Sequence, residues 1–264
     1  MAIEVKNLRF CYGGRPVIGD VSFTAEKGEL LAVLGPNGVG KSTLFRCLLG
    51  FLEPVSGEIL AEGKPLSGYS RRELARKIAY IPQSHTPAFD HTVLDSVLMG
   101  MTAQLGVFEQ PGQAQREKAM QMLRALGMEK LSDRGCMKIS GGERQLMLLA
   151  RALVQDASML IMDEPTANLD YGNSCRVMER VQQLGRQGYT IIFSTHDPNQ
   201  AFSYATKVLA LKDGGVMASG APRDVLTEAV LSQLYGIPVA RCEVQTKLGT
   251  KTICMPMPGG EEDN

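Results

Sequence analysis

The residues best suited to chemistry form a glycine-rich loop that ends in a lysine and two hydroxyl residues, Gly35-Pro36-Asn37-Gly38-Val39-Gly40-Lys41-Ser42-Thr43. The apolar run 30–34 precedes this loop and the helix-like stretch 44–49 follows it, as the G-x-x-x-x-G-K-[ST] motif requires. Glycines let successive backbone N–H groups converge on a phosphate, and the dipole of the following helix also favours an anion there. We expect Lys41 to reach the β- and γ-phosphates and Ser42 to bind Mg²⁺. The loop therefore predicts binding of a nucleoside triphosphate, the alternative being a strand–helix turn that binds nothing.

Two neighbouring acidic residues follow the apolar, strand-like run 159–162. Asp163 is placed to complete the coordination of Mg²⁺ opposite Ser42. Glu164 is placed to polarise an attacking water as a general base. An isolated Asp-Glu pair is usually a solvated loop end, but behind an apolar strand in a chain with a nucleotide loop the functional interpretation is favoured.

Three further side chains are candidates only because the chain also contains the nucleotide loop and the Asp163-Glu164 pair. Gln83 follows a short apolar strand and is suited to contact Mg²⁺ or the attacking water. His196 follows another apolar strand; it either caps the helix that starts at Asp197-Pro198, or senses the γ-phosphate and holds the catalytic glutamate in line. Tyr12 lies beside a glycine turn, where it is either packed or stacked on an adenine ring.

A second glycine-rich helix start, Ser140-Gly141-Gly142-Glu143-Arg144-Gln145, provides a second surface of backbone N–H groups and a hydroxyl. One chain rarely needs two such surfaces for one γ-phosphate. Two chains packed head-to-tail do, because each then completes the other's site across a symmetric interface. This segment therefore predicts a dimer.

At these residues the sequence resembles the ATP-binding cassette (ABC) family over residues 3–211, with the motifs in the family's order. The resemblance implies ATP and Mg²⁺ as ligands. It implies that Tyr12 stacks on adenine, that residues 35–43 form the Walker A loop, and that Gln83 is the Q-loop glutamine. One departure, Ile139 where the family usually has leucine, is a conservative apolar change.

The same resemblance assigns roles to the remaining motifs. Ser140-Gly141-Gly142-Glu143 matches the signature sequence, which closes over the ATP of the partner subunit. Asp163 and Glu164 resemble the Walker B carboxylate and the catalytic glutamate. Ala167-Asn168-Leu169-Asp170 matches the D-loop, and His196 the switch histidine. The presence of Glu164 implies that the subunit hydrolyses ATP.

The implied fold class is α/β: a P-loop NTPase core with an N-terminal antiparallel β subdomain and a helical insertion. We predict one ABC ATPase domain over residues 1–264. Residues 1–83 and 157–240 would form its RecA-like and β core, residues 84–156 the helical subdomain with the signature motif, and residues 241–264 a C-terminal tail. Hydrophobic periodicity and capping residues predict the main elements. The predicted strands are 3–10, 21–24, 30–34, 57–61, 78–81, 159–162 and 189–194, and the predicted helices include 70–77, one starting at Thr92, one up to 155, and 173–186.

Composition restricts the possible partners. Lys and Arg together number 28, as do Asp and Glu, so no excess charge favours nucleic acid. The apolar runs are too short to span a bilayer, and the N-terminus has no secretory h-region, so we expect a cytoplasmic location. The six cysteines are scattered without a C-x-x-C pair, which is typical of reduced thiols.

Shorter segments are similar to the ATPases of iron-chelate importers, which carry siderophores, haem or cobalamin. They are residues 97–100, 142–146 and 169–173, with Tyr235-Gly236 near the end. This similarity implies a homodimer in the ATP-bound state, docked on the inner face of the membrane against an integral membrane permease dimer. An extracytoplasmic substrate-binding protein would act indirectly. Residues 84–106 would receive the permease's coupling helix.

Other functions stay open at this point. A soluble ABC ATPase, for example in iron–sulfur cluster assembly or DNA repair, is one; the balanced charge counts against DNA handling. An importer ATPase for another nutrient, such as free metal ions, is a second. A P-loop GTPase or kinase is a third, but the sequence has no Asn-Lys-x-Asp motif and that function would leave residues 140–143 unexplained.

Overall fold

The structure is a computed structural model that describes residues 1–83, 89–105, 109–247 and 249–257. It contains two compact units. The first combines Met1–Pro65 with Ile192–Asn264, and the second is Leu66–Ile191. The subdomain division predicted above follows the motifs and stays a prediction.

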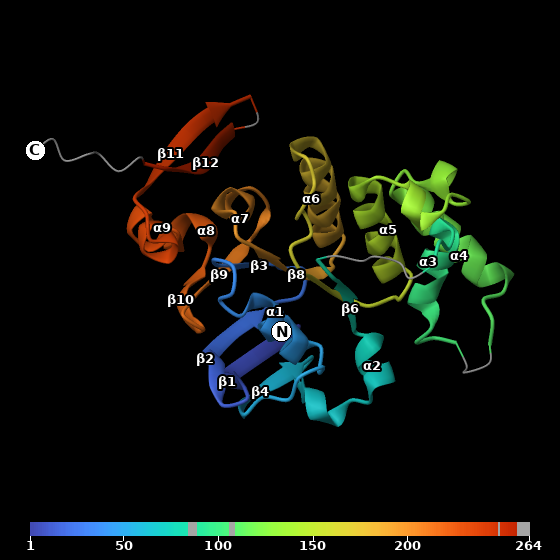
Figure 1. The fold of residues 1–264 in the computed structure, drawn as a ribbon, viewed down its shortest axis with the longest axis horizontal. Helices are drawn as coiled ribbons and strands as arrows, with labels where there is room; N and C mark the ends of the chain where they lie inside the picture. Colours follow the sequence, from blue (N-terminus) through green and yellow to red (C-terminus); the bar gives the residue numbers. More distant parts are fainter. Residues whose placement is uncertain (84–88, 106–108, 248, 258–264) are drawn as a thin grey trace, which may run out of the picture. The chain divides into compact units, whose positions relative to one another are not determined.

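The first unit begins with an antiparallel sheet whose strands lie in the order β2-β1-β4-β5 (Figure 1). In β1, Ile3 and Val5 are buried, as are Leu8 and Phe10, because alternate side chains of a strand point to one face and the register shifts between Val5 and Leu8. These strands confirm the predicted N-terminal antiparallel sheet. Their bounds are β1 Ile3–Tyr12, β2 Arg15–Ala25, β4 Ser56–Ala61 and β5 Lys64–Pro65.

The first unit also contains β10, β9, β3 and the end of β8, side by side in this order. All five residues of β3 are buried, as in a parallel strand covered on both faces, and β3 pairs in parallel with β9. The chain enters the unit along β8. The bounds are β3 Leu30–Leu34, β8 Thr190–Thr195, β9 Lys207–Lys212 and β10 Gly215–Gly220, with helices α1 Lys41–Leu48, α7 Pro198–Tyr204, α8 Pro222–Val225 and α9 Glu228–Tyr235.

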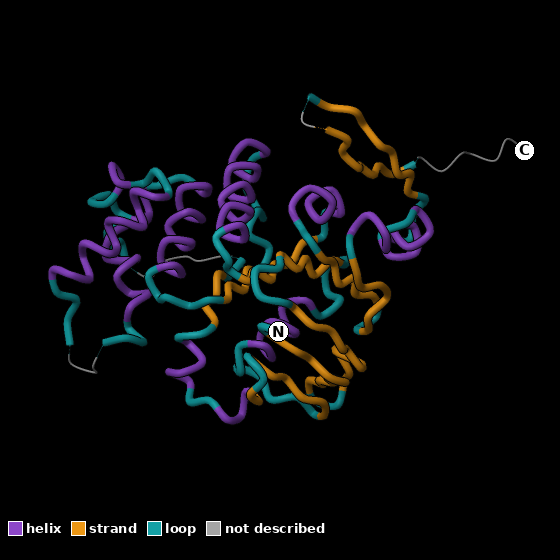
Figure 2. The backbone as a smooth tube through the Cα atoms, turned by 180° about the vertical axis from the view of Figure 1, so that it is seen from behind, coloured by secondary structure: helices purple, strands orange, loops and turns teal. Residues whose placement is uncertain are grey.

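The first unit ends in an antiparallel hairpin, β11 Val239–Thr246 and β12 Gly249–Pro256. Figure 2 shows it as an orange pair of strands that continues from the last helix. Residues 241–264 are therefore not simply a tail, as predicted from the sequence, because most of them belong to these two strands. Most of β11 is exposed, but Ala240, Cys242 and Val244 alternate with polar residues, and this period of two is the signal that could have indicated the strand. Residues 258–264, the last part of the predicted tail, lie outside the described residues.

The second unit joins a parallel strand pair to a group of helices. β6 and β7 pair with Ile81 opposite Met162. Helices α3, α4 and α5 contact one another and are green in Figure 1. Thr92 caps α3 and Ser70 caps α2, as predicted. The bounds are α2 Arg71–Ala75, β6 Ile78–Ile81, α3 Val93–Leu98, α4 Gln113–Ala125, α5 Gly141–Leu153, β7 Met159–Met162 and α6 Tyr171–Arg186, with 3₁₀ turns at Leu66–Gly68, Met99–Met101, Glu129–Leu131 and Cys136–Lys138.

Candidate functional site

The predicted nucleotide loop, residues 35–43, connects β3 to α1, and its glycines are required by its geometry. Gly38 and Gly40 have φ angles of +83° and +107°, in the left-handed region that favours glycine. A Cβ at Gly35 would lie 2.6 Å from the carbonyl oxygen of Leu211, and one at Gly40 would lie 3.0 Å from that of Val17. The loop can therefore pass close to neighbouring backbone only because these positions lack side chains.

The donor groups of this loop fit a phosphate. Lys41 is only 6% exposed, and its Nζ donates to the carbonyl oxygens of Gly35 at 2.8 Å and Pro36 at 3.1 Å. Helix α1 starts at Lys41, so the hydroxyl residues Ser42 and Thr43 lie in its first turn. This turn has no acidic residue and Gly40 provides no side-chain cap. A helix N-terminus of this kind is suited to an external anion.

The first unit also places the His196 segment against the loop. The N–H of Gly35 donates to the carbonyl oxygen of Thr195 at 3.3 Å, so the residue before His196 is bonded to the first residue of the loop. The His196 side chain is exposed. Tyr12 ends β1 with its ring edge-on to Phe10, at 4.8 Å between centroids, and 43% exposed. Its ring is therefore both packed and accessible for stacking.

The second unit joins two of the candidates directly. Gln83 Nε2 donates to Glu164 Oε2 at 3.2 Å. This contact follows from the parallel pairing of β6 and β7, in which the N–H of Asp163 donates to the carbonyl oxygen of Ile81 at 2.9 Å. Asp163 is 4% exposed, and Glu164 has a φ of +42°. The sequence predicted functional roles for Gln83 and Glu164, but it did not predict the hydrogen bond between them.

The signature segment forms a capping box at the start of α5. Ser140 Oγ accepts from the N–H of Glu143 at 3.3 Å, and Glu143 Oε2 accepts from the N–H of Ser140 at 2.7 Å. Hydrogen bonds from the Ser140 backbone and hydroxyl hold the pKa of Glu143 below its usual value. Glu143 thus stays ionised at the helix N-terminus, where a negative charge is stabilising. The Ser140 hydroxyl thus accepts from the N–H of Glu143 and donates to its carboxylate, while Gly141 and Gly142 place their N–H groups in the first turn of the helix, where an anion is favoured.

The signature glycines also allow close packing against the D-loop and α6. A Cβ at Gly142 would lie 2.7 Å from Cγ of Asn173, and one at Gly141 would lie 3.2 Å from Cδ2 of Leu169. Asp170 caps α6, because its Oδ1 accepts from the N–H of Asn173 at 2.8 Å. Hydrogen bonds from Asn173 lower the pKa of Asp170 below its ordinary value. Sequence reasoning missed this contact, although a Gly-Gly pair in a helix is the signal that could have indicated it.

The fold and the two glycine-rich helix starts define a P-loop ATPase. The chain belongs to the ABC transporter family, whose model matches residues 18–167. Such an ATPase hydrolyses ATP to drive transport, and ATPases of importers work as dimers with membrane permease subunits. In the part of the chain that the structure describes, none of the helices is long and apolar enough to cross a membrane.

Curated relatives and solved structures match almost the whole chain. A probable iron chelatin transport ATP-binding protein of Helicobacter pylori is 37% identical over 90% of this chain and 94% of its own. A molybdate import ATP-binding protein of Haemophilus influenzae is 35% identical over 97% and 96%. The structure of a putative metal-chelate type ABC transporter in an inward-facing conformation superposes with a TM-score of 0.88, 35% identity and 97% coverage of both chains.

Proposed function

We propose that the chain powers the import of a metal chelate of the siderophore, haem or cobalamin type. The observation that carries this proposal is its likeness to a metal-chelate type transporter over 97% of both chains. The likeness to an iron chelatin transport protein supports it independently. The likeness to a molybdate import protein favours a second candidate, an importer ATPase for another nutrient such as free metal ions or an oxyanion.

In the proposed reaction Lys41 and the N–H groups of residues 35–43 bind the phosphates. Ser42, Asp163 and Gln83 would hold Mg²⁺, which neutralises charge on the phosphate oxygens. Their hydroxyl, carboxylate and amide oxygens are the ligands that this ion prefers.

Glu164 takes the proton of the attacking water as a general base. Gln83 fixes one oxygen of this carboxylate through its 3.2 Å hydrogen bond. His196 senses the γ-phosphate, and Tyr12 stacks on the adenine.

Ser140, Gly141, Gly142 and Glu143 would bind the γ-phosphate of ATP held by a second copy of the chain. Support comes from the helix start itself: Gly141 and Gly142 begin α5, so their backbone N–H groups lie at a helix N-terminus that is suited to an external anion. Asp170 would lie at the same interface, because the signature glycines pack against the D-loop. ATP binding would therefore close a homodimer, and hydrolysis would reopen it.

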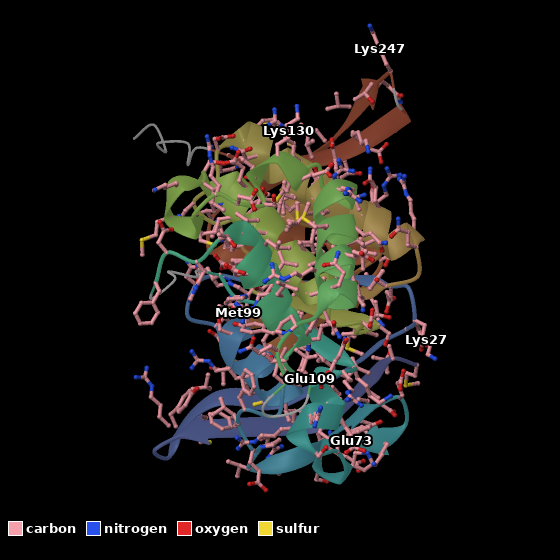
Figure 3. The ribbon with its side chains drawn as sticks, turned by 90° about the vertical axis from the view of Figure 1, so that its right-hand side faces the viewer. Lys27, Glu73, Met99, Glu109, Lys130 and Lys247 are labelled. Carbon is pink, nitrogen blue, oxygen red and sulfur yellow. The ribbon has the colours of Figure 1, made fainter. Side chains whose placement is uncertain are left out.

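A groove of about 770 Å³ in the second unit supports docking of a permease helix. Its lining combines the guanidinium groups of Arg71 and Arg116 with the apolar side chains of Leu98 and Met99; Figure 3 labels Met99 and Glu109, another lining residue. Arg72 Nε donates to the carbonyl oxygen of Ala103 at 2.8 Å and so holds one wall. Asp95 and Glu109 also line the groove, and its mixture of apolar side chains with both signs of charge suits an amphipathic helix. Docking there would hold the ATPase at the inner face of the membrane.

The test of the cargo is ATP hydrolysis measured with membranes that contain the candidate permease and binding protein. Chelates are varied one at a time, with molybdate and free metal ions in parallel. Stimulation by one chelate is the expected result. Stimulation only by an ion would favour the second candidate, and hydrolysis indifferent to every permease would indicate a soluble partner.

The general base is tested separately by Glu164→Gln, which keeps the shape of the side chain. We expect turnover to fall by at least about a hundredfold, because a general base typically contributes that factor or more. ATP binding should persist and trap the closed dimer, detectable by size-exclusion chromatography. Normal hydrolysis by this variant would rule out the assignment of Glu164 as the base.

A further inference from the structure

The asparagine Asn199 joins helix α7 to the C-terminal hairpin by two hydrogen bonds. Asn199 Nδ2 donates to the carbonyl oxygen of Cys254 at 3.1 Å, and the N–H of Cys254 donates to Asn199 Oδ1 at 2.9 Å. The side-chain amide thus pairs with β12 as a peptide group of a neighbouring strand would. Asn199 is also the third residue after His196, and its own N–H donates to Asp197 Oδ1 at 2.8 Å in the cap of α7.

A second contact reaches His196 itself. The hydroxyl of Tyr235, the last residue of α9, donates to the carbonyl oxygen of His196 at 2.9 Å. Burial raises the pKa of this hydroxyl above its ordinary value. The group therefore keeps its proton and remains a donor at any pH at which the protein works.

The carbonyl groups of two successive residues, Thr195 and His196, are therefore hydrogen-bonded to two different segments of the first unit. The carbonyl of Thr195 accepts from Gly35 of the nucleotide loop, and the carbonyl of His196 accepts from Tyr235. The imidazole of His196 is exposed, and it extends from the backbone that these two bonds hold. A change in either bond would therefore shift the Cα of His196 relative to the loop.

We propose that Tyr235 and Asn199 are positioning residues for His196, and that the hairpin fixes the histidine's backbone beside the nucleotide loop for ATP hydrolysis. This inference rests on the proposed role of His196. It assigns a function to the C-terminal segment: α9 and β12 act on the hydrolytic step through the histidine, without touching the nucleotide.

The first test is Tyr235→Phe, which removes one oxygen and keeps the ring. In the purified full-length chain we expect kcat for ATP hydrolysis to fall roughly three- to tenfold, as loss of one hydrogen bond would produce. The Kd for ATP should stay within about twofold, since the phosphate-binding groups are untouched. The matched control is Tyr189→Phe, which also removes one phenolic oxygen. Tyr189 precedes β8 whereas His196 follows it, so this variant should change neither kcat nor Kd. Unchanged kcat in Tyr235→Phe would overturn the proposal.

A double-mutant cycle with His196→Ala separates this inference from the role of the histidine. If Tyr235 acts through His196, adding Tyr235→Phe to His196→Ala causes no further loss. A full, multiplicative further loss would show that Tyr235 acts elsewhere. If His196→Ala alone keeps normal turnover, the proposed role of the histidine fails, which is a different outcome.

Amide hydrogen exchange tests the structural premise without turnover. Peptides covering residues 195–202 should exchange faster in Tyr235→Phe and in Asn199→Asp, because one loses the bond to His196 and the other loses the donor to Cys254. Peptides of β1 serve as the internal reference and should be unchanged. Equal exchange of residues 195–202 in the variants and the unaltered chain would overturn the proposal.

Discussion

Glu164 has a backbone conformation that is unfavourable for its residue type, and alanine and glycine substitutions there should reveal the strain. Its φ is +42°, and a left-handed conformation costs an L-residue with a Cβ about 1–2 kcal/mol. Alanine keeps the Cβ and this cost, whereas glycine removes it and loses about 0.5–1 kcal/mol through the greater freedom of the unfolded chain. We therefore expect Glu164→Gly to be more stable than Glu164→Ala by about 0.5–1 kcal/mol.

Both variants lose the same hydrogen bond from Gln83, so the difference between them isolates the backbone. The assay is urea unfolding of the full chain without nucleotide. Glu62, with a φ of +49° in the β4–β5 turn, should show the same order. Glu179, exposed within α6, should show the reverse, because glycine costs about 1 kcal/mol relative to alanine in a helix. Lower stability of Glu164→Gly than of Glu164→Ala would refute the argument from strain.

Three further predictions concern the nucleotide loop, the helical packing and the thiols. Lys41→Ala should weaken ATP binding itself, and an unchanged Kd by titration calorimetry would contradict its phosphate role. Gly100→Ala should destabilise the chain by about 1–3 kcal/mol in urea unfolding, because its Cβ would overlap the carbonyl oxygen of Arg151; a change below about 0.5 kcal/mol, the usual range of neutral surface changes, would contradict this. Iodoacetamide at pH 8 should label exposed Cys242 well before Cys47, because burial raises the pKa of Cys47 to about 11 and leaves little thiolate. Labelling of Cys47 before Cys242, detected by mass spectrometry, would contradict the burial of Cys47.

The parts of the fold that could be predicted are those specified by local patterns. The strands at 78–81 and 159–162 are confirmed with their predicted bounds, because unbroken apolar runs closed by polar residues mark buried parallel strands. The capping box at Ser70 is confirmed because its two reciprocal bonds need only residues three apart. The ABC family and its ATPase function were predictable because each motif, such as residues 35–43 or 140–143, is a short contiguous segment that can be recognised without knowledge of the fold.

The features that sequence reasoning missed depend on residues far apart in the chain. The hairpin β11–β12 is joined to α7 by two hydrogen bonds of the Asn199 side chain, which cannot be foreseen from a helix-start sequence. The bond between Gln83 and Glu164 depends on the pairing of two strands separated by a long helical segment. Individual roles within the site stay predictions that the experiments above address.

The close approach at Gly142 has a consequence for how the dimer would report its nucleotide state. With Asn173 close to this glycine and Asp170 bonded to Asn173, the signature helix would displace Asn173 if it moved toward α6. Any displacement of Ser140 on contact with a partner's ATP would be passed to the D-loop as a matching displacement. The signature segment and the D-loop would then move together when the partner's nucleotide binds, in one conformational change and not in two separate ones.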